Sequence, residues 1–199
     1  MEDIWLWISG NWIELSGALI SLIYLYFSVK QIIWLWPFGL LSALFYIWIY
    51  YFSGFYADMG LQVYYVVISA YGWYHWSTGY DSAEGKRELK ISRINRSTLV
   101  LLIGIFLILW LGISFVLLRL TGSQVPIMDA LTTAGAIVAT WMLARKILEH
   151  WLLWVFVDAV SIGLYFYKGL YATASLFIVY TIVAIVGFLA WRKVMTKDS

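Results

Sequence analysis

The sequence predicts an all-α integral membrane protein whose seven transmembrane helices form two parallel three-helix bundles joined by a linker helix, a 3+1+3 arrangement. Three observations lead to this fold class. Hydrophobic residues make up 63% of the 199 and charged residues 12%, against roughly half and a quarter in soluble domains. Seven apolar runs are long enough to cross a bilayer. The first three and the last three runs also align with each other at one constant offset.

The seven runs follow one another through a single membrane domain, 1–199. A hydrocarbon layer of about 30 Å takes roughly 17–25 helical residues. Runs of that length lie near 12–29, 32–52, 58–77, 98–118, 125–144, 151–167 and 171–191. The first three runs predict one bundle over 12–77, the fourth predicts the linker helix over 98–118, and the last three predict a second bundle over 125–191.

Positions 14–76 align with positions 129–191 without gaps at an offset of 115. A shared Gly-x-Tyr-Ala turn and several aromatic residues and glycines coincide: Gly54 with Gly169, Trp36 with Trp151, Tyr50 with Tyr165, Tyr65 with Tyr180, Gly72 with Gly187, and Trp76 with Trp191. Identity is low, and chance similarity between apolar segments is the alternative. Because a single helix separates the two units, the second enters the membrane in the same direction as the first. Substrate sites between parallel repeats lie near the middle of the membrane.

Basic residues predict the orientation, because short cytoplasmic loops are enriched in Lys and Arg. With the N-terminus outside and the C-terminus inside, only Arg119 and Lys168 remain on the outer side. The cytoplasmic side then receives Lys30, Lys86, Arg87, Lys90, Arg93, Arg96, Arg145, Lys146, Arg192, Lys193 and Lys197. We therefore expect a multi-pass protein with its N-terminus out and its C-terminus in.

The sixth run contains a carboxylate near its middle. A charged side chain at the centre of a bilayer costs about 2.5–3.5 kcal/mol on insertion scales, so Asp158 is expected to face a cavity, a partner or a ligand. Helical steps of three or four residues place Trp151, Trp154, Asp158, Ser161 and Tyr165 on one face. Such a face could hold a flat, polar molecule, including a cationic one, since aromatic rings attract cations and a carboxylate neutralises them. The alternative is a buried carboxylate held by hydroxyl groups or an indole N–H.

The third and second runs carry related faces. The face of the third run has Asp58, Gln62, Tyr65, Ser69 and Trp73 at steps of three or four, and the second run has Trp36, Gly39, Ala43, Tyr46 and Tyr50. An amide at the depth of Gln62 needs a hydrogen-bonding partner, which is either a neighbouring helix or a ligand. Ala43 occupies the position that corresponds to Asp158, so the predicted site is asymmetric.

Several function classes are disfavoured. The chain contains no cysteine, which excludes disulfides and thiolate chemistry. The histidines, His75 and His150, lie at helix ends away from any serine or carboxylate pair, and the sequence has no HExxH motif or phosphate-binding glycine loop. The last run has no internal lysine for retinal. We expect no catalytic residues, no metal, no cofactor and no nucleic-acid partner, so the protein is predicted not to be an enzyme.

Four motifs together resemble the bacterial nicotinamide riboside transporter family PnuC, whose relatives carry thiamine and riboflavin. The motifs are WPFG at 36–39, GFYADMGLQVYY at 54–65, YGWYHW at 71–76 and WVFVDAVSIGLYFYKGLYATA at 154–174. The resemblance implies two parallel three-helix bundles with a connecting helix, similar to the sugar-transporting SWEET proteins. It also implies a site of aromatic, amide and carboxylate groups between the bundles. The candidate substrate-binding residues are Trp151, Trp154, Asp158, Gln62, Tyr65, Trp73, Trp36 and Tyr46.

The resemblance implies a transporter in the bacterial inner membrane. The vitamin would cross by facilitated diffusion, without ATP or a coupled ion, and a cytoplasmic kinase would trap it as a phosphate; family members also suggest a homotrimer. The cationic ring and carboxamide of nicotinamide riboside suit Asp158 and Gln62, thiamine is the alternative because its ring is also cationic, and the neutral riboflavin ranks third. A receptor that binds without transport, and an intramembrane enzyme, are the other classes of function to be tested.

Overall fold

The computed structural model describes residues 19–53, 56–79, 89–120 and 124–197 of the chain. Within these ranges the chain forms seven helices, and no β-structure apart from one bridge between Ser92 and Ile147. The helices are Leu19–Val29, α2 (Leu35–Ser53), α3 (Tyr56–Ser77), α4 (Arg96–Leu120), α5 (Pro126–Ala144), α6 (His150–Tyr167) and α7 (Tyr171–Lys197). The predicted helix start at residue 12 and the Gly54 turn lie outside the described residues.

The helix bounds differ from the predicted runs by three residues or more at two places, for local reasons. α2 begins at Leu35 and not at 32, because Gln31 adopts the left-handed conformation with φ 57. The preceding helix closes there with hydrogen bonds from the backbone N–H groups of Gln31 and Ile32 to carbonyl oxygens of that helix, as helix ends commonly do. α7 continues past residue 191 to Lys197, where basic side chains complement the negative end of the helix dipole.

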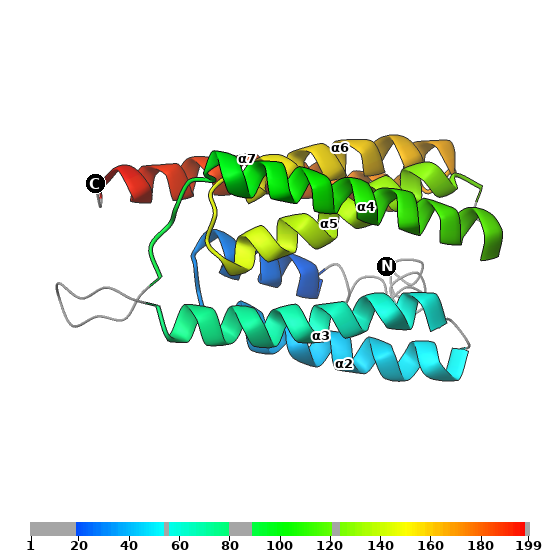
Figure 1. Ribbon diagram of the computed structural model, residues 1–199, viewed down its shortest axis with the longest axis horizontal. Helices are drawn as coiled ribbons and strands as arrows, with labels where there is room; N and C mark the ends of the chain where they lie inside the picture. Colours follow the sequence, from blue (N-terminus) through cyan, green and yellow to red (C-terminus); the bar gives the residue numbers. More distant parts are fainter. Residues whose placement is uncertain (1–18, 54–55, 80–88, 121–123, 198–199) are drawn as a thin grey trace, which may run out of the picture.

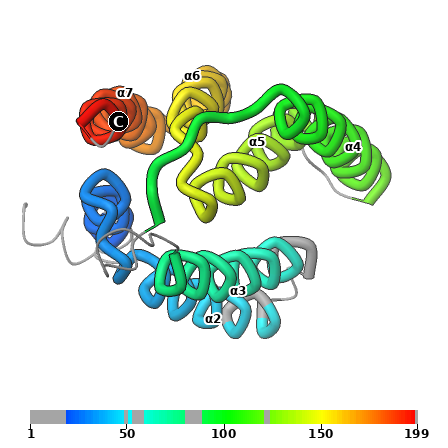
Figure 2. Tube along the Cα trace, turned by 60° about the vertical axis from the view of Figure 1, so that its left-hand side comes forward, coloured from blue at the N-terminus to red at the C-terminus, as the bar shows by residue number. Residues whose placement is uncertain are grey.

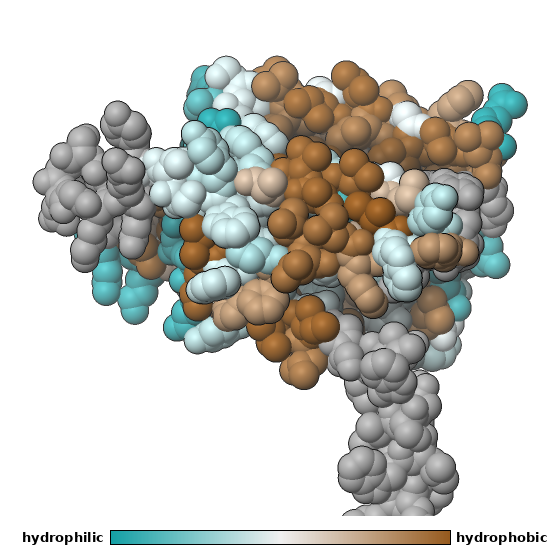
Figure 3. All heavy atoms as spheres, turned by 90° about the horizontal axis from the view of Figure 1, so that it is seen from below, coloured by the Kyte–Doolittle hydropathy of each residue, from teal (hydrophilic) through white to brown (hydrophobic). Residues whose placement is uncertain are grey.

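Four of the described helices, α4 to α7, are long and apolar enough to cross a membrane. The apolar stretches Leu19–Val29 and Leu35–Trp48 are shorter over the described residues. Only 11% of the most apolar part of α4 is buried inside the protein. The rest of its apolar surface is therefore stable only in an apolar environment such as a membrane. Hydrophobic side chains dominate the middle of the face shown in Figure 3, and hydrophilic ones lie towards its ends. The chain is therefore a multi-pass membrane protein.

The helices run along the long axis of the molecule (Figure 1) and pack in neighbouring pairs. α2 packs on α3, α6 on α7, α4 on α5 and α5 on α6, while α3 contacts α5. Viewed towards the helix ends, the helix Leu19–Val29 lies between α7 and the α2–α3 pair (Figure 2). Helices that are far apart in the sequence therefore surround the centre of the molecule.

Two buried tryptophans pack directly on glycines of a neighbouring helix. A Cβ atom added to Gly72 would lie 2.5 Å from the ring of Trp36, and one added to Gly187 would lie 2.6 Å from the ring of Trp151. Distances below 3.0 Å do not occur for real Cβ atoms. Each contact therefore requires glycine. The second contact repeats the first at an offset of 115 residues.

The same offset relates two hydrogen bonds, each of which joins the first half of the chain to the second. Trp76 Nε1 donates to the carbonyl oxygen of Ala144 at 3.1 Å, and Trp191 Nε1 donates to that of Val29 at 3.1 Å. Adding 115 to the first donor and subtracting 115 from its acceptor gives the second bond. Lys146 Nζ donates to Gln31 Oε1 at 3.1 Å across 115 residues. Lys146 thus contacts Gln31, the residue that corresponds to it at this offset. Both residues have a positive φ, 50 for Lys146 and 57 for Gln31.

Replacing Gly187 with Ala is expected to destabilise the protein by about 1–3 kcal/mol, because the methyl group would overlap the Trp151 ring and overpacked cores lose that much. The measurement is the thermal unfolding of the purified protein in detergent. Gly104→Ala on α4 is the matched control, since nothing lies within 4 Å of its added Cβ. Equal melting temperatures for both variants would contradict the close packing of Trp151 on α7.

Candidate functional site

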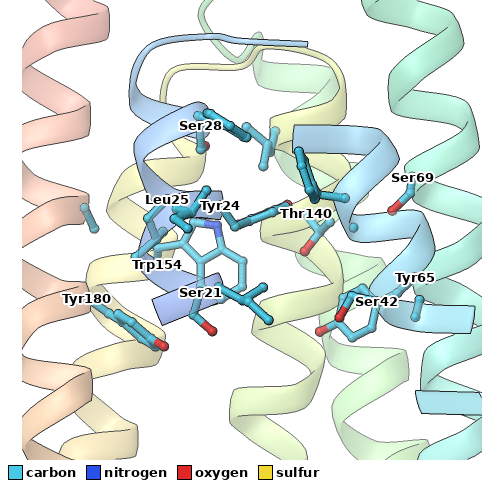
Figure 4. A pocket seen from close by; sticks show the side chains of 18 of the residues that line it. Ser21, Tyr24, Leu25, Ser28, Ser42, Tyr65, Ser69, Thr140, Trp154 and Tyr180 are labelled. Atoms are coloured by element: carbon cyan, nitrogen blue, oxygen red, sulfur yellow. The ribbon is translucent and has the colours of Figure 1, made fainter. Parts of the chain in front are cut away.

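A cavity of about 450 Å³ lies among the helices and is lined by residues of Leu19–Val29, α2, α3, α5, α6 and α7. Figure 4 shows hydroxyl and aromatic side chains from these helices pointing into it. The lining includes six of the eight predicted site residues, namely Tyr46, Gln62, Tyr65, Trp151, Trp154 and Asp158. The size and mixed lining are those of a small-molecule site, since such sites are mostly apolar with a few polar groups.

Asp158 lies on α6 and lines the cavity with only 4% of its surface exposed. Among the residues that the structure describes, its carboxylate forms no hydrogen bond and no salt bridge. An isolated buried carboxylate is unfavourable unless a partner compensates for the lost water. A ligand in the cavity would supply this partner.

The two α6 tryptophans contribute differently. Trp151 is 1% exposed and is held by Gly187 and by an edge contact with Trp191, with ring centroids 5.8 Å apart. Trp154 is only partly buried and presents its ring to the interior, between the first described helix and α5 (Figure 4). Trp151 is therefore fixed by its packing on α7 where it lines the cavity, whereas Trp154 offers a flat aromatic surface to a ligand.

The other predicted residues divide into two groups. Gln62 and Tyr65 on α3, and Tyr46 on α2, line the cavity as the helical pattern predicts. Trp36 and Trp73 do not line it. Trp36 is buried against Gly72 and the edge of Trp76, with ring centroids 5.5 Å apart, and Trp73 is 43% exposed. We therefore leave both tryptophans out of the proposed site.

Several lining residues were not among the predicted ones. They are Ser21, Tyr24 and Ser28 on the first described helix, Ser42 on α2, Thr140 on α5, and Phe177 and Tyr180 on α7. Tyr180 could have been found, because it is the counterpart of Tyr65 at the offset of 115. The serines gave no signal, since single hydroxyl groups are common within transmembrane helices.

The charge of the cavity restricts its ligand. Asp158 is the one carboxylic acid among the described lining residues, and these include no Lys, Arg or His. No group of three or more potential metal ligands occurs within the described part of the chain. A phosphate would meet a carboxylate here and no basic side chain, whereas a cation or a neutral aromatic compound is compatible with the lining.

Comparisons with known proteins show that the chain is similar to membrane transporters. A family model described as "Nicotinamide mononucleotide transporter" matches residues 11–193. The "Nicotinamide riboside transporter PnuC" of Escherichia coli is 26% identical over 205 residues, which cover 91% of this chain and 85% of that protein. The "Riboflavin/roseoflavin transporter RibM" of Streptomyces davaonensis is 28% identical over 196 residues, 94% of this chain and 88% of that protein. A crystal structure of the "Vitamin B3 transporter PnuC" has the same fold, with a TM-score of 0.73 at 22% identity, covering 100% of this chain and 88% of that one.

Proposed function

The chain belongs to the PnuC family, whose model is described as a nicotinamide mononucleotide transporter, and on this premise we propose that it carries unphosphorylated nicotinamide riboside across the membrane. The observation that carries the proposal is Asp158, the buried carboxylate that has no described partner at the cavity. The pyridinium ring of the riboside bears a permanent positive charge. It would lie between Asp158 and the face of Trp154, because carboxylates and indole rings both attract cations.

The phosphorylated form of the ligand fits the cavity less well. Nicotinamide mononucleotide adds a phosphate, and the described lining offers no basic side chain to hold it. Burying an unpaired phosphate beside Asp158 would cost several kcal/mol. We therefore assign the riboside and not the mononucleotide to this site.

Thiamine is the second candidate, because its thiazolium ring is also cationic and could meet Asp158. Riboflavin ranks third by charge, since its ring is neutral, although one relative is named a riboflavin/roseoflavin transporter. The lining residues away from α6 distinguish these ligands.

We propose transport by facilitated diffusion through alternating access. The two three-helix units, joined by α4, would rock against each other about the cavity. The contacts that recur at the offset of 115 residues support two equivalent units, and the contact of Lys146 with its counterpart Gln31 would lie on the axis between them. The proposed orientation in the inner membrane, with the C-terminus inside, places this contact on the cytoplasmic side. Phosphorylation of the riboside by a cytoplasmic kinase would keep the inward gradient.

Titration calorimetry on the purified protein tests the substrate. We expect saturable binding of nicotinamide riboside, and binding of the mononucleotide at least about a hundredfold weaker, since each tenfold change corresponds to about 1.4 kcal/mol. Binding of thiamine or riboflavin without the riboside would overturn the assignment. Riboside that accumulates unchanged in proteoliposomes distinguishes transport from a receptor, which would move nothing, and from an enzyme, which would modify it.

A further inference from the structure

The cavity is lined by pairs of residues that correspond at the offset of 115 but differ in chemistry. Ala43 corresponds to Asp158, Gln62 to Phe177, and Ser69 to Ala184, and all six line the cavity. In each of these pairs, the residue on one wall is polar and the corresponding residue on the other wall is apolar. The wall formed by α6 and α7 carries the charge and an aromatic ring. The wall formed by α2 and α3 carries an amide and a hydroxyl group.

A glycine on the second wall corresponds to an aromatic residue on the first. Gly39 on α2 corresponds to Trp154 on α6, and both line the cavity. The indole of Trp154 fills space on its own side, whereas at Gly39 the side chains of Ser69 and Tyr24 come close to the backbone, 3.1 Å and 3.6 Å from the position of an added Cβ. A ligand with a flat ring at one end and a polar, non-aromatic group at the other matches this division.

Ser69 is a hydroxyl-bearing residue of α3 that lines the cavity on this side. It is 5% exposed, yet its side chain makes no hydrogen bond to any residue that the structure describes. Buried hydroxyls on helices ordinarily bond to the carbonyl oxygen four residues earlier, as Ser161 does at 2.8 Å and Thr140 does at 2.7 Å. Ser69 lacks this bond, so its hydroxyl is available to a ligand.

Gly39 lies directly beside that hydroxyl, so a larger residue there would crowd it. A Cβ atom added to Gly39 would lie 3.1 Å from Ser69 Oγ, closer than most Cβ contacts. Figure 4 shows Ser69 on α3 across the cavity from Trp154, with Ser42 and Tyr65 on the same side as Ser69. The hydroxyl therefore lies beside Gly39 at the wall of the cavity that is opposite Trp154.

We propose that Ser69 determines specificity by hydrogen bonding to a hydroxyl of the sugar or polyol part of the substrate, while the flat ring lies against the α6 wall. This rests on the proposed function, since it names the part of the ligand that reaches α3. It favours a ring that carries a hydroxylated carbon chain, as in a riboside or a ribityl flavin. It disfavours thiamine, which has an aminopyrimidine ring in place of a sugar and a single hydroxyl on a short hydroxyethyl group.

The test compares Ser69→Ala with the unaltered protein, using nicotinamide riboside and its 2′-deoxy and 3′-deoxy analogues as calorimetric probes. Loss of one neutral hydrogen bond should weaken riboside binding about fivefold to tenfold. The same substitution should leave unchanged the binding of the analogue that lacks the bonded hydroxyl. Gly39→Ala, which crowds Ser69 Oγ, should show the same selective loss.

Ser114→Ala is the matched control, because Ser114 is a buried serine of α4 that does not line the cavity, and it should not change riboside affinity. Equal loss for the riboside and for both deoxy analogues would make Ser69 structural and overturn the proposal. Unchanged riboside binding in Ser69→Ala would overturn it as well, with the proposed function intact. Absence of riboside binding by the unaltered protein would contradict the proposed function itself.

Discussion

Replacing Asp158 with Asn is expected to weaken the binding of nicotinamide riboside about tenfold to a hundredfold. The side chain keeps its shape but loses the charge that attracts the pyridinium ring, and interactions with a charged group contribute about 1.5–3 kcal/mol. Titration calorimetry on the purified variant gives the dissociation constant. The structure also predicts that the variant folds, because the carboxylate has no hydrogen bond to another described residue that could be broken.

The control for this substitution is Asp129→Asn. Asp129 also lies in a transmembrane helix, but it pairs with Lys168 at 3.0 Å and does not line the cavity, so its loss should leave riboside affinity unchanged. Thermal unfolding of Asp158→Asn separates loss of binding from loss of structure. Unchanged affinity in this variant would assign Asp158 to the packing of α6 and remove the main support for a cationic substrate.

Cross-linking residue 31 to residue 146 is expected to abolish transport. The chain has no cysteine, so Gln31→Cys combined with Lys146→Cys provides two unique thiols where the native side chains meet at 3.1 Å. A short, reducible bifunctional thiol reagent would hold the two units together at this end. Alternating access requires them to separate, so uptake of riboside into proteoliposomes should fall to background and return after reduction.

A second pair of thiols controls for the chemistry of the reagent. Asp129 and Lys168 are also in contact, at 3.0 Å, but both belong to the second half of the chain. Cross-linking Asp129→Cys to Lys168→Cys joins residues that would move together, so uptake should persist. The single-cysteine variants should be unaffected by the reagent. Full uptake in a completely cross-linked 31–146 protein would rule out separation of the two units at this contact.

The helices could be predicted because apolar length determines them, but their ends could not all be placed. The run predicted from 32 begins inside the turn between Gln31 and Leu35, and the left-handed residue of that turn, Gln31, is neither a glycine nor an asparagine that would have marked it. The charged end of α7 is helical although its hydropathy falls. The pattern of apolar residues indicates which part of a helix lies in apolar surroundings. It does not indicate the residue at which the backbone hydrogen bonds of the helix end.

The residues of the candidate site could be predicted where a polar residue interrupts an apolar helix. Asp158 and Gln62 stood out because polar groups are rare in apolar helices, and both line the cavity. Trp36 and Trp73 were chosen for sharing a helical face with such residues, but the face of a helix is wider than the cavity, and both lie outside its lining. Ser69 lay on the predicted face of α3, but its missing intrahelical bond can be seen only in the structure.

The contact between Gln31 and Lys146 also bears on how such a chain can arise. In a symmetric dimer of two half-length chains, the position on the axis would hold two copies of one residue. Two lysines would repel each other there, and two glutamines would lack the cation that now lies 4.5 Å from the Trp76 ring. Duplication and fusion of the halves allows each copy to change independently. An unlike pair at this position is therefore possible in one fused chain and impossible in a homodimer of identical halves.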